Sequence, residues 1–169
     1  MLKNSLVLLF LFLTACGEFQ AKQPPYIDAA LEPYVQTYRD YKLDILDIDY
    51  IKNIDVFFQI LEPYVLGKCI IYGNGDRVIL IDPDYWSTMG EADREVVILH
   101  EMGHCDLNRG HASAPSIMEA YHIGGYNYLN SKNYYLVELF TLQRNNLLAK
   151  MKATETKYKC NHTGGNKHE

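Results

Sequence analysis

The feature that most constrains the fold is a pair of histidines spaced four residues apart, in the segment HEMGH at residues 100–104. Val96, Val97 and Leu99 precede it, which is the apolar spacing of a helix packed against a core. On an α-helix, residues i and i+4 lie about 40° apart around the axis and about 6 Å apart along it. Both imidazoles can therefore converge on one metal ion, with Glu101 to the side of the pair.

A catalytic zinc ion usually has three protein ligands and one open position, so a third ligand is required. His111 is the first candidate. On a continuous helix it would face nearly the same way as His100 but lie about 16 Å further along the axis. The chain must therefore leave the helix after His104 and fold back. The residues Asn-Arg-Gly at 108–110 supply a break, and we expect Gly110 to end the helix.

The glutamate inside this motif has a specific chemical use. In a hydrolytic zinc site the metal polarises the substrate carbonyl and lowers the pKa of its water toward about 7, while a carboxylate takes the proton. The sequence therefore predicts Zn²⁺ ligands at His100, His104 and His111, and a general base at Glu101. The alternative is a pair of buried core histidines, which would be costly without a metal.

The segment HEMGHCDLNRGH, followed by Ser116-Ile117-Met118, resembles the metzincin clan of zinc metallopeptidases. Those enzymes have the pattern HExxHxxGxxH and then a turn with a methionine beneath the metal. The resemblance implies a zincin-like fold, hydrolysis of protein or peptide substrates, and Met118 as the Met-turn residue. This chain has one extra residue before His111, so its turn must differ. The pattern is also similar to small bacterial lipoproteins described as metallopeptidases.

Two glutamates remain alternatives to His111 as the third ligand. In gluzincins this ligand is a glutamate from a later helix, and Glu138 lies on an expected helix. Glu138 would otherwise be a polar helix residue or a hydrogen-bond partner of a ligand histidine. Glu119 lies directly after Met118.

Further polar residues follow the motif. Tyr121 and His122 are candidates for donating a hydrogen bond to the developing oxyanion. Some metzincins use a tyrosine two residues after the methionine, whereas Tyr121 is three residues after Met118. For Asp106 we expect a solvated helix residue rather than a partner that orients a histidine.

The chain predicts one α+β domain over residues 26–153. Apolar spacing indicates helices at about residues 32–43 and 134–152. Between them, Ser87 or Thr88 begins the helix that carries HEMGH.

Runs rich in β-branched and aromatic residues predict three strands, at residues 54–61, 64–72 and 77–82. The residues GNGD at 73–76 indicate a hairpin between the last two. We therefore expect a small, mostly antiparallel sheet packed on the N-terminal helix and the HEMGH helix. One of the two hairpin strands would be an edge that aligns an extended peptide.

The N-terminus predicts a targeting segment at residues 1–15. Lys3 is followed by the apolar run LVLLFLFL, which is too short to span a bilayer as a helix. The run ends in LTAC, which resembles the lipobox of bacterial lipoproteins and implies lipidation of Cys16; an ordinary secretory signal is the alternative. In some Gram-negative bacteria, an aspartate directly after the lipidated cysteine is associated with retention in the inner membrane. Gly17 occupies that position here, which favours the outer membrane. Residues 16–25 would be a polar tether, and residues 154–169 a polar, disordered tail.

Export to an oxidising compartment allows disulfides among the remaining cysteines, Cys69, Cys105 and Cys160. We favour a bridge between Cys69 and Cys105, which would join the HEMGH helix to the sheet. A buried free thiol at Cys105 is the alternative.

Charge and composition limit the partners. The net charge is −5 and no run of lysine and arginine indicates nucleic-acid binding. We expect a monomer that contacts a membrane only through its lipid anchor. Two other functions remain open: a non-catalytic zinc-binding lipoprotein of the cell envelope, and an interaction module with structural zinc. The second requires a fourth ligand, for which His122 and Cys105 are the candidates.

Overall fold

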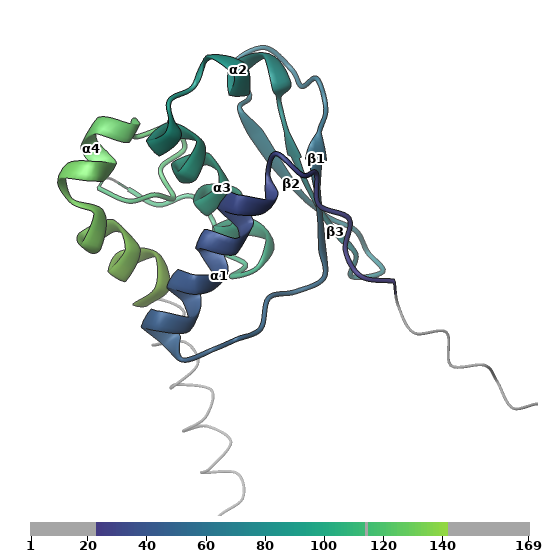
Figure 1. Cartoon of the computed structure of the whole chain (residues 1–169), viewed down its shortest axis with the longest axis horizontal. Helices are drawn as coiled ribbons and strands as arrows, with labels where there is room; N and C mark the ends of the chain where they lie inside the picture. Colours follow the sequence, from purple (N-terminus) through teal and green to yellow (C-terminus); the bar gives the residue numbers. More distant parts are fainter. Residues whose placement is uncertain (1–22, 114, 142–169) are drawn as a thin grey trace, which may run out of the picture.

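A computed structural model of the chain describes residues 23–113 and 115–141. These residues form an α+β fold, which confirms the expected fold class (Figure 1). The named elements, in chain order, are α1 (Glu32–Leu46), β1 (Ile54–Phe58), β2 (Gly67–Ile71), β3 (Arg77–Ile81), α2 (Pro83–Thr88), α3 (Glu91–Cys105) and α4 (Gly125–Asn130). A further helical segment occupies residues 132–141.

Several expectations fall outside the described residues. These are the signal segment at residues 1–15, lipidation of Cys16, most of the tether, the end of the C-terminal helix and the tail at 154–169. Within the described ranges, no helix is both long enough and apolar enough to cross a membrane.

The sheet is mixed, with the strand order β1-β3-β2. The predicted hairpin at residues 73–76 is present, because β2 pairs antiparallel with β3. The other pairing is parallel, between β1 and β3, so the expectation of a mostly antiparallel sheet is wrong. The connection between β1 and β2 carries β2 past β3 to the far side of the sheet. Consequently β3 is central and cannot serve as the edge strand, whereas β2 lies at an edge.

The opposite edge of the sheet is partly covered. Residue Ile27 forms an isolated parallel bridge with Val56 of β1. The N–H of Asp28 donates to the carbonyl of Val56 at 2.8 Å, and the N–H of Val56 donates to the carbonyl of Tyr26 at 2.8 Å. Among the described residues, the edge of the sheet without a paired strand or bridge is therefore that of β2, where the backbone of Cys69 hydrogen-bonds to Glu101.

A short helix, α2, precedes the histidine helix. Asp82 caps it by accepting from the N–H groups of Asp84 and Tyr85, and Pro83 occupies the first turn. The expectation that Ser87 or Thr88 begins the HEMGH helix is wrong, because both lie in the last turn of α2. The α3 helix instead begins at Glu91 after Gly90.

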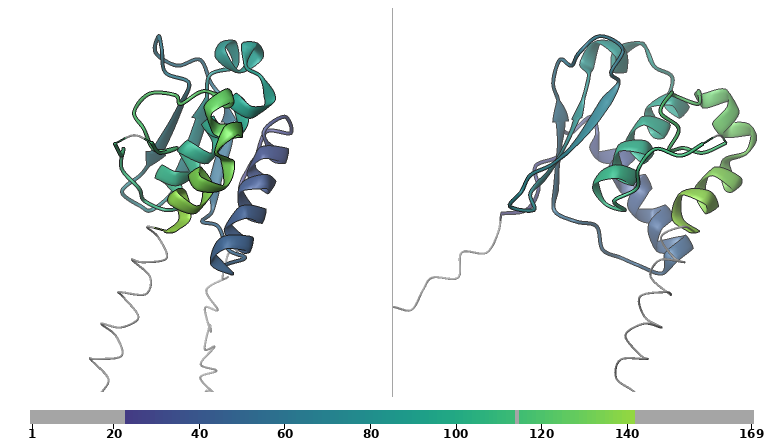
Figure 2. Two further views of the ribbon diagram at one scale, coloured as in Figure 1. Left: turned by 90° about the vertical axis from the view of Figure 1, so that its left-hand side faces the viewer. Right: turned by 180° about the vertical axis from the view of Figure 1, so that it is seen from behind.

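The core lies between the sheet and the helices. α3 and α1 lie on the same side of the sheet, and the segment at residues 125–141 covers α3 from the other side (Figures 1 and 2). Fully buried side chains come from each layer, including Val35 and Tyr38, Val56 and Ile79, Ile98 and Met102, and Leu139 and Phe140. Helix α3 is therefore in contact with every other layer of the fold.

Asp106 directly follows α3 and fastens its end. It is buried, and its carboxylate accepts from Lys42 at 2.6 Å and from the Tyr38 hydroxyl at 2.7 Å. The backbone N–H of Lys52 donates to the other carboxylate oxygen at 3.0 Å. The expectation of a solvated residue is wrong: Asp106 joins α3 to α1 and to the residues before β1.

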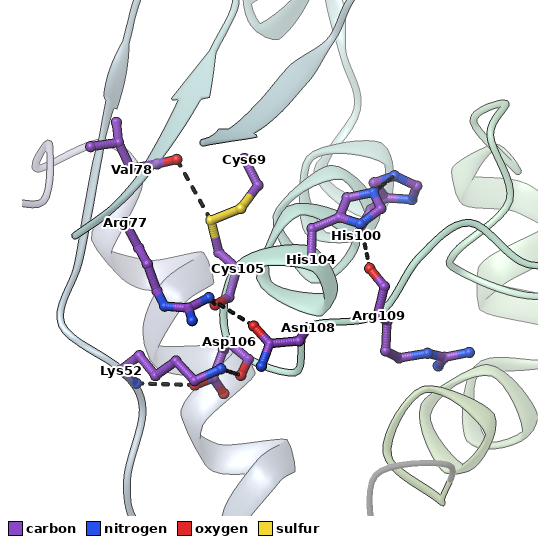
Figure 3. The surroundings of a disulfide bond; sticks show 10 residues. All are labelled: Lys52, Cys69, Arg77, Val78, His100, His104, Cys105, Asp106, Asn108 and Arg109. Atoms are coloured by element: carbon purple, nitrogen blue, oxygen red, sulfur yellow. Dashed lines mark hydrogen bonds between the residues drawn. A yellow bond between two sulfur atoms is a disulfide. The ribbon is translucent and has the colours of Figure 1, made fainter. Parts of the chain in front are cut away.

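A disulfide between Cys69 and Cys105 links β2 to the last residue of α3, with the Cα atoms 5.6 Å apart. This is the pairing that the sequence analysis favours. Figure 3 shows Arg77 beside it, and its guanidinium donates to the carbonyl of Cys105 at 2.5 Å and to Asn108 Oδ1 at 2.9 Å. The disulfide therefore holds the edge strand β2 against the histidine helix α3.

We predict that replacing Cys69 and Cys105 together with alanine lowers the free energy of unfolding by about 2–4 kcal/mol, because the bridge restricts the unfolded chain. Urea unfolding of the oxidised wild type and of the variant measures this difference. A reducing agent serves as the control, since it should destabilise the wild type and leave the variant unchanged. Equal midpoints for the oxidised wild type and the variant would contradict the prediction.

Candidate metal centre

The two histidines of α3 face each other as their spacing predicts. The ring centroids of His100 and His104 are 4.7 Å apart, and their Nε2 atoms are 3.0 Å apart. The rings project from the side of α3 that borders the large cleft described below.

Backbone carbonyls orient both rings. His100 Nδ1 lies 2.7 Å from the carbonyl oxygen of Ile117, and His104 Nδ1 lies 2.7 Å from that of Arg109. Because a carbonyl can only accept, each Nδ1 carries the proton and each neutral ring presents a lone pair at Nε2. This is the usual way in which an outer hydrogen bond prepares a histidine to bind a metal.

Burial keeps these rings neutral. It lowers the pKa of His100 to about 4, although the hydrogen bond to Ile117 opposes the shift. Burial is also the main reason that the pKa of His104 is lowered. At neutral pH two lone pairs therefore face each other at 3.0 Å with no proton between them. A cation held by both nitrogens would remove this repulsion, so the donor arrangement fits a metal ion.

The chain folds back after α3 and returns His111 to the other two histidines. Its ring centroid lies 5.4 Å from that of His100 and 4.9 Å from that of His104. One nitrogen from each of the three rings lies within 4.8 Å of the others. This group could hold a metal ion, and it is the one group of its kind found among residues 23–113 and 115–141. The predicted break is confirmed.

The break differs from the expectation, because α3 ends at Cys105 and not at Gly110. The left-handed position is Asn108, with φ 54°, and not Gly110. Asparagine tolerates this backbone conformation better than most residues do. Here the Asn108 side chain accepts a hydrogen bond from Arg77, and the N–H of Arg109 donates to the carbonyl of Gly103 at 2.9 Å. A contact with β3 thus stabilises the turn that delivers His111.

Met118 lies beneath the histidine helix. It is fully buried, and a Cβ atom added at Gly103 would collide with its sulfur and methyl group. Its carbonyl accepts from the N–H of Ala112, next to His111. The small residue within HEMGH therefore permits the methionine to pack directly against α3 at Gly103, next to His104.

Glu101 lies between α3 and β2. It is only 6% exposed, and burial raises its pKa from 4.5 to about 8, against the opposing effect of a hydrogen bond from the backbone of Cys69. Gly67 makes room for it, because a Cβ atom there would lie 2.9 Å from Glu101 Cγ and 3.0 Å from Oε1. Sequence reasoning missed Gly67. An isolated glycine within a strand, which often marks a close approach, was the available signal.

A cleft of about 920 Å³ opens over the three histidines and Glu101. One wall is β2 with the residues before it, and the other is the segment at residues 117–122. Tyr121 belongs to the second wall and is 86% exposed, while Tyr64 on the first wall is 90% exposed. His122 also lines the cleft, but its Nε2 lies 2.9 Å from Asp93, outside the histidine group.

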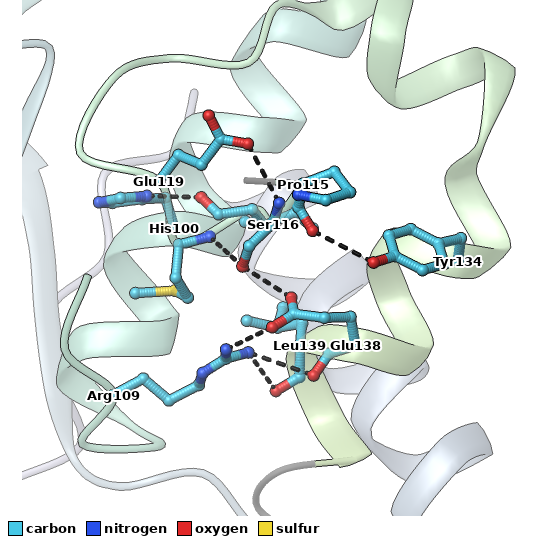
Figure 4. A network of polar contacts seen from close by, with 10 residues as sticks. His100, Arg109, Pro115, Ser116, Glu119, Tyr134, Glu138 and Leu139 are labelled. Atoms are coloured by element: carbon cyan, nitrogen blue, oxygen red, sulfur yellow. Dashed lines mark hydrogen bonds and ion pairs between the residues drawn. The ribbon is translucent and has the colours of Figure 1, made fainter. Parts of the chain in front are cut away.

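The alternative third ligands are not part of the histidine group. Glu138 forms an ion pair of 2.6 Å with Arg109 and accepts from Ser116 at 2.8 Å (Figure 4). Glu119 accepts from the backbone N–H of Ser116 at 3.1 Å. Sequence reasoning did not anticipate the roles of Arg109 and Ser116, since both partners of Glu138 are more than twenty residues away along the chain.

Comparison with protein-family models, curated proteins and solved structures finds no significant match to this chain. The described chain combines three imidazoles that could bind one metal ion, a buried carboxylate beside them and an open cleft above.

The pKa of Glu101 predicts a pH effect on the metal-free protein. Between pH 4.5 and about 8 the folded state retains this proton and the unfolded state does not. The stabilising contribution is therefore complete below pH 4.5 and is lost as the pH rises to about 8. Glu101→Gln does not titrate, so its stability relative to wild type should increase with pH, by more than about 1 kcal/mol between pH 5 and 7.

Urea unfolding with a chelator present, at a series of pH values, measures this difference. Glu91→Gln, an exposed glutamate of the same helix, is the matched control for the substitution. A constant difference for Glu101→Gln would mean that the folded state does not retain the proton.

Proposed function

We propose that this protein is a zinc-dependent metallopeptidase of metzincin-like type, with a zincin-like fold. One observation carries the proposal: three imidazoles converge beside a buried glutamate at the floor of an open cleft. The lipobox at Cys16 supports attachment to the bacterial cell envelope, at the outer membrane.

The donor set favours zinc. Three imidazole nitrogens are typical ligands of catalytic zinc, which binds them at about 2.0–2.1 Å and keeps a fourth position open. His100 and His104 are already oriented through Nδ1, and His111 is brought to them by the turn at Asn108. When bound, zinc would polarise a substrate carbonyl and lower the pKa of a water molecule.

Glu101 would act as the general base and then as the general acid. A bound zinc cation would favour ionisation of this buried side chain, and its carboxylate would then take a proton from the attacking water and pass it to the leaving amine. Gly67 gives this side chain its space, and the backbone N–H of Cys69 fixes its direction. Tyr121, exposed on the opposite wall of the cleft, is the candidate donor to the oxyanion.

The edge strand β2 supports a peptide substrate. Residues of β2 line the cleft, and the strand lies against the helix that carries His100 and Glu101. An extended peptide could pair with this edge through main-chain hydrogen bonds, so that one of its carbonyls reaches the histidines. Binding through the backbone would favour unfolded or flexible segments of protein substrates.

Two observations oppose a structural zinc site with four protein ligands. Cys105 is bonded to Cys69, and the Nε2 of His122 is paired with Asp93. The histidine group thus supplies three protein ligands and leaves room for a substrate. A non-catalytic zinc-binding lipoprotein remains the second candidate, but a pure binding site has no use for a carboxylate in the position of Glu101.

The central test combines metal analysis with cleavage of a peptide library. We expect one zinc ion per chain and cleavage that a chelator abolishes and zinc restores. Glu101→Gln should retain zinc and lose activity by about 10²–10⁴-fold, because it cannot transfer the proton. Glu91→Gln is the control and should cleave like the wild type.

Absence of stoichiometric zinc would contradict the proposal as a whole. If zinc is bound but wild type and Glu101→Gln cleave equally little across the library, the non-catalytic zinc-binding function takes its place. His111→Ala should lose zinc, whereas loss of zinc from Glu119→Ala would instead reassign the third ligand.

A second test addresses the space around the general base. Gly67→Ala places a methyl group against Glu101 and should shift the carboxylate. We expect lower kcat with unchanged zinc content, because the ligands do not move. Gly73→Ala is the matched control, since a Cβ atom there meets nothing within 4 Å. Wild-type kcat in Gly67→Ala would show that the position of Glu101 tolerates the methyl group.

A further inference from the structure

Glu138 joins two loops within the single connection between α3 and α4, one at Arg109 and one at Ser116. Its Oε1 lies 2.6 Å from Nη2 of Arg109, and its Oε2 accepts from the Ser116 hydroxyl at 2.8 Å (Figure 4). The Arg109 side chain is 7% exposed and that of Glu138 is 20% exposed. The ion pair is therefore largely shielded from solvent. Charge-assisted hydrogen bonds are strong and directional in such shielded surroundings.

Each of these loops carries a carbonyl that orients a histidine. The carbonyl of Arg109 itself accepts from His104, and the carbonyl of Ile117, which follows Ser116, accepts from His100. Movement of either loop would turn an imidazole and misdirect its Nε2. The single carboxylate of Glu138 thus contacts Arg109, which carries one orienting carbonyl, and Ser116, which precedes the residue that carries the other.

Other contacts extend this arrangement to the rest of the centre. Arg109 also donates to the carbonyl of Leu139 at 2.9 Å, so the guanidinium is fixed on the helical segment at residues 132–141. The Ser116 hydroxyl accepts from the N–H of Met118 at 3.0 Å, which shapes the turn beneath α3. Between the two loops, the N–H of Ala112 donates to the carbonyl of Met118 at 2.8 Å.

We propose that Glu138 is a positioning residue that sets the affinity of the metal centre without contacting the metal, by clamping Arg109 and Ser116. We call these three residues the carboxylate brace. This inference rests on the proposed function, because it takes the three histidines to be zinc ligands. Partners of this kind, one step removed from the metal, typically change metal affinity by about 10–100-fold when they are replaced.

The fold contains a matched ion pair that serves as the control. Lys42 and Asp106 also lie 2.6 Å apart, and the Lys42 side chain is 7% exposed, like that of Arg109. This pair joins α1 to the end of α3 and involves neither orienting carbonyl. Lys42→Met and Arg109→Met therefore remove equivalent buried cations, but only the second disturbs the histidines.

The first experiment measures zinc affinity by competition with a chromophoric chelator, in variants whose folding is verified by circular dichroism. We expect Arg109→Met and Glu138→Gln to weaken zinc binding by about 10–100-fold, and Lys42→Met by less than about threefold. The inference is overturned if both brace variants, while folded, bind zinc as tightly as the wild type. An equal loss in Lys42→Met would also overturn it, because a general loss of stability would then explain the effect.

The second experiment needs no metal and separates this inference from the proposed function. Nitrogen-15 NMR of the chelator-treated protein reports which ring nitrogen carries the proton. Wild type and Lys42→Met should show His100 and His104 protonated at Nδ1, and the brace variants should show a mixture of both tautomers. A wild type that binds no zinc would refute the proposed function. Unchanged tautomers in the folded brace variants would refute the role of Glu138.

Discussion

The candidate metal centre depends on two partly buried imidazoles whose Nε2 atoms face each other at 3.0 Å. This arrangement is unfavourable in itself, because neutral lone pairs repel and burial opposes protonation of either ring. It persists because His100 and His104 are anchored at one end by α3 and at the other by backbone carbonyls. Those carbonyls come from two parts of the connection between α3 and α4, so both parts of this connection must be held in place.

The same helix serves as the centre of the fold and as the platform of the site. α3 is fastened to β2 by a disulfide, to α1 by the buried ion pair of Asp106, and to the turn at Met118 by close packing at Gly103. Each fastening lies within a few residues of His100 or His104. These contacts hold α3 in the fold, whereas the carbonyls of Arg109 and Ile117 direct the two imidazoles.

Much of this could be predicted from local sequence. The helical spacing of His100 and His104, the need for a chain reversal before His111, the hairpin and the α+β class all follow from periodicity and turn residues. Local signals were insufficient where a distant partner decides the outcome. The local sequence predicts that Asp106 is solvated, because its partners Lys42 and Tyr38 lie far away along the chain. Asn108, rather than Gly110, takes the left-handed turn because Arg77 of β3 binds its side chain.

The sequence by itself determined the chemistry: two imidazoles and a glutamate on one helix, a break, and a third histidine beyond it. Only the tertiary structure decided which groups complete the centre. In the folded protein β2, and not β3, is the edge strand beside Glu101. Glu138 binds Arg109 and Ser116 and is not part of the histidine group. The physical reason is that helix geometry relates residues a few positions apart. Hydrogen bonds and ion pairs between residues far apart in the sequence depend on how the layers pack.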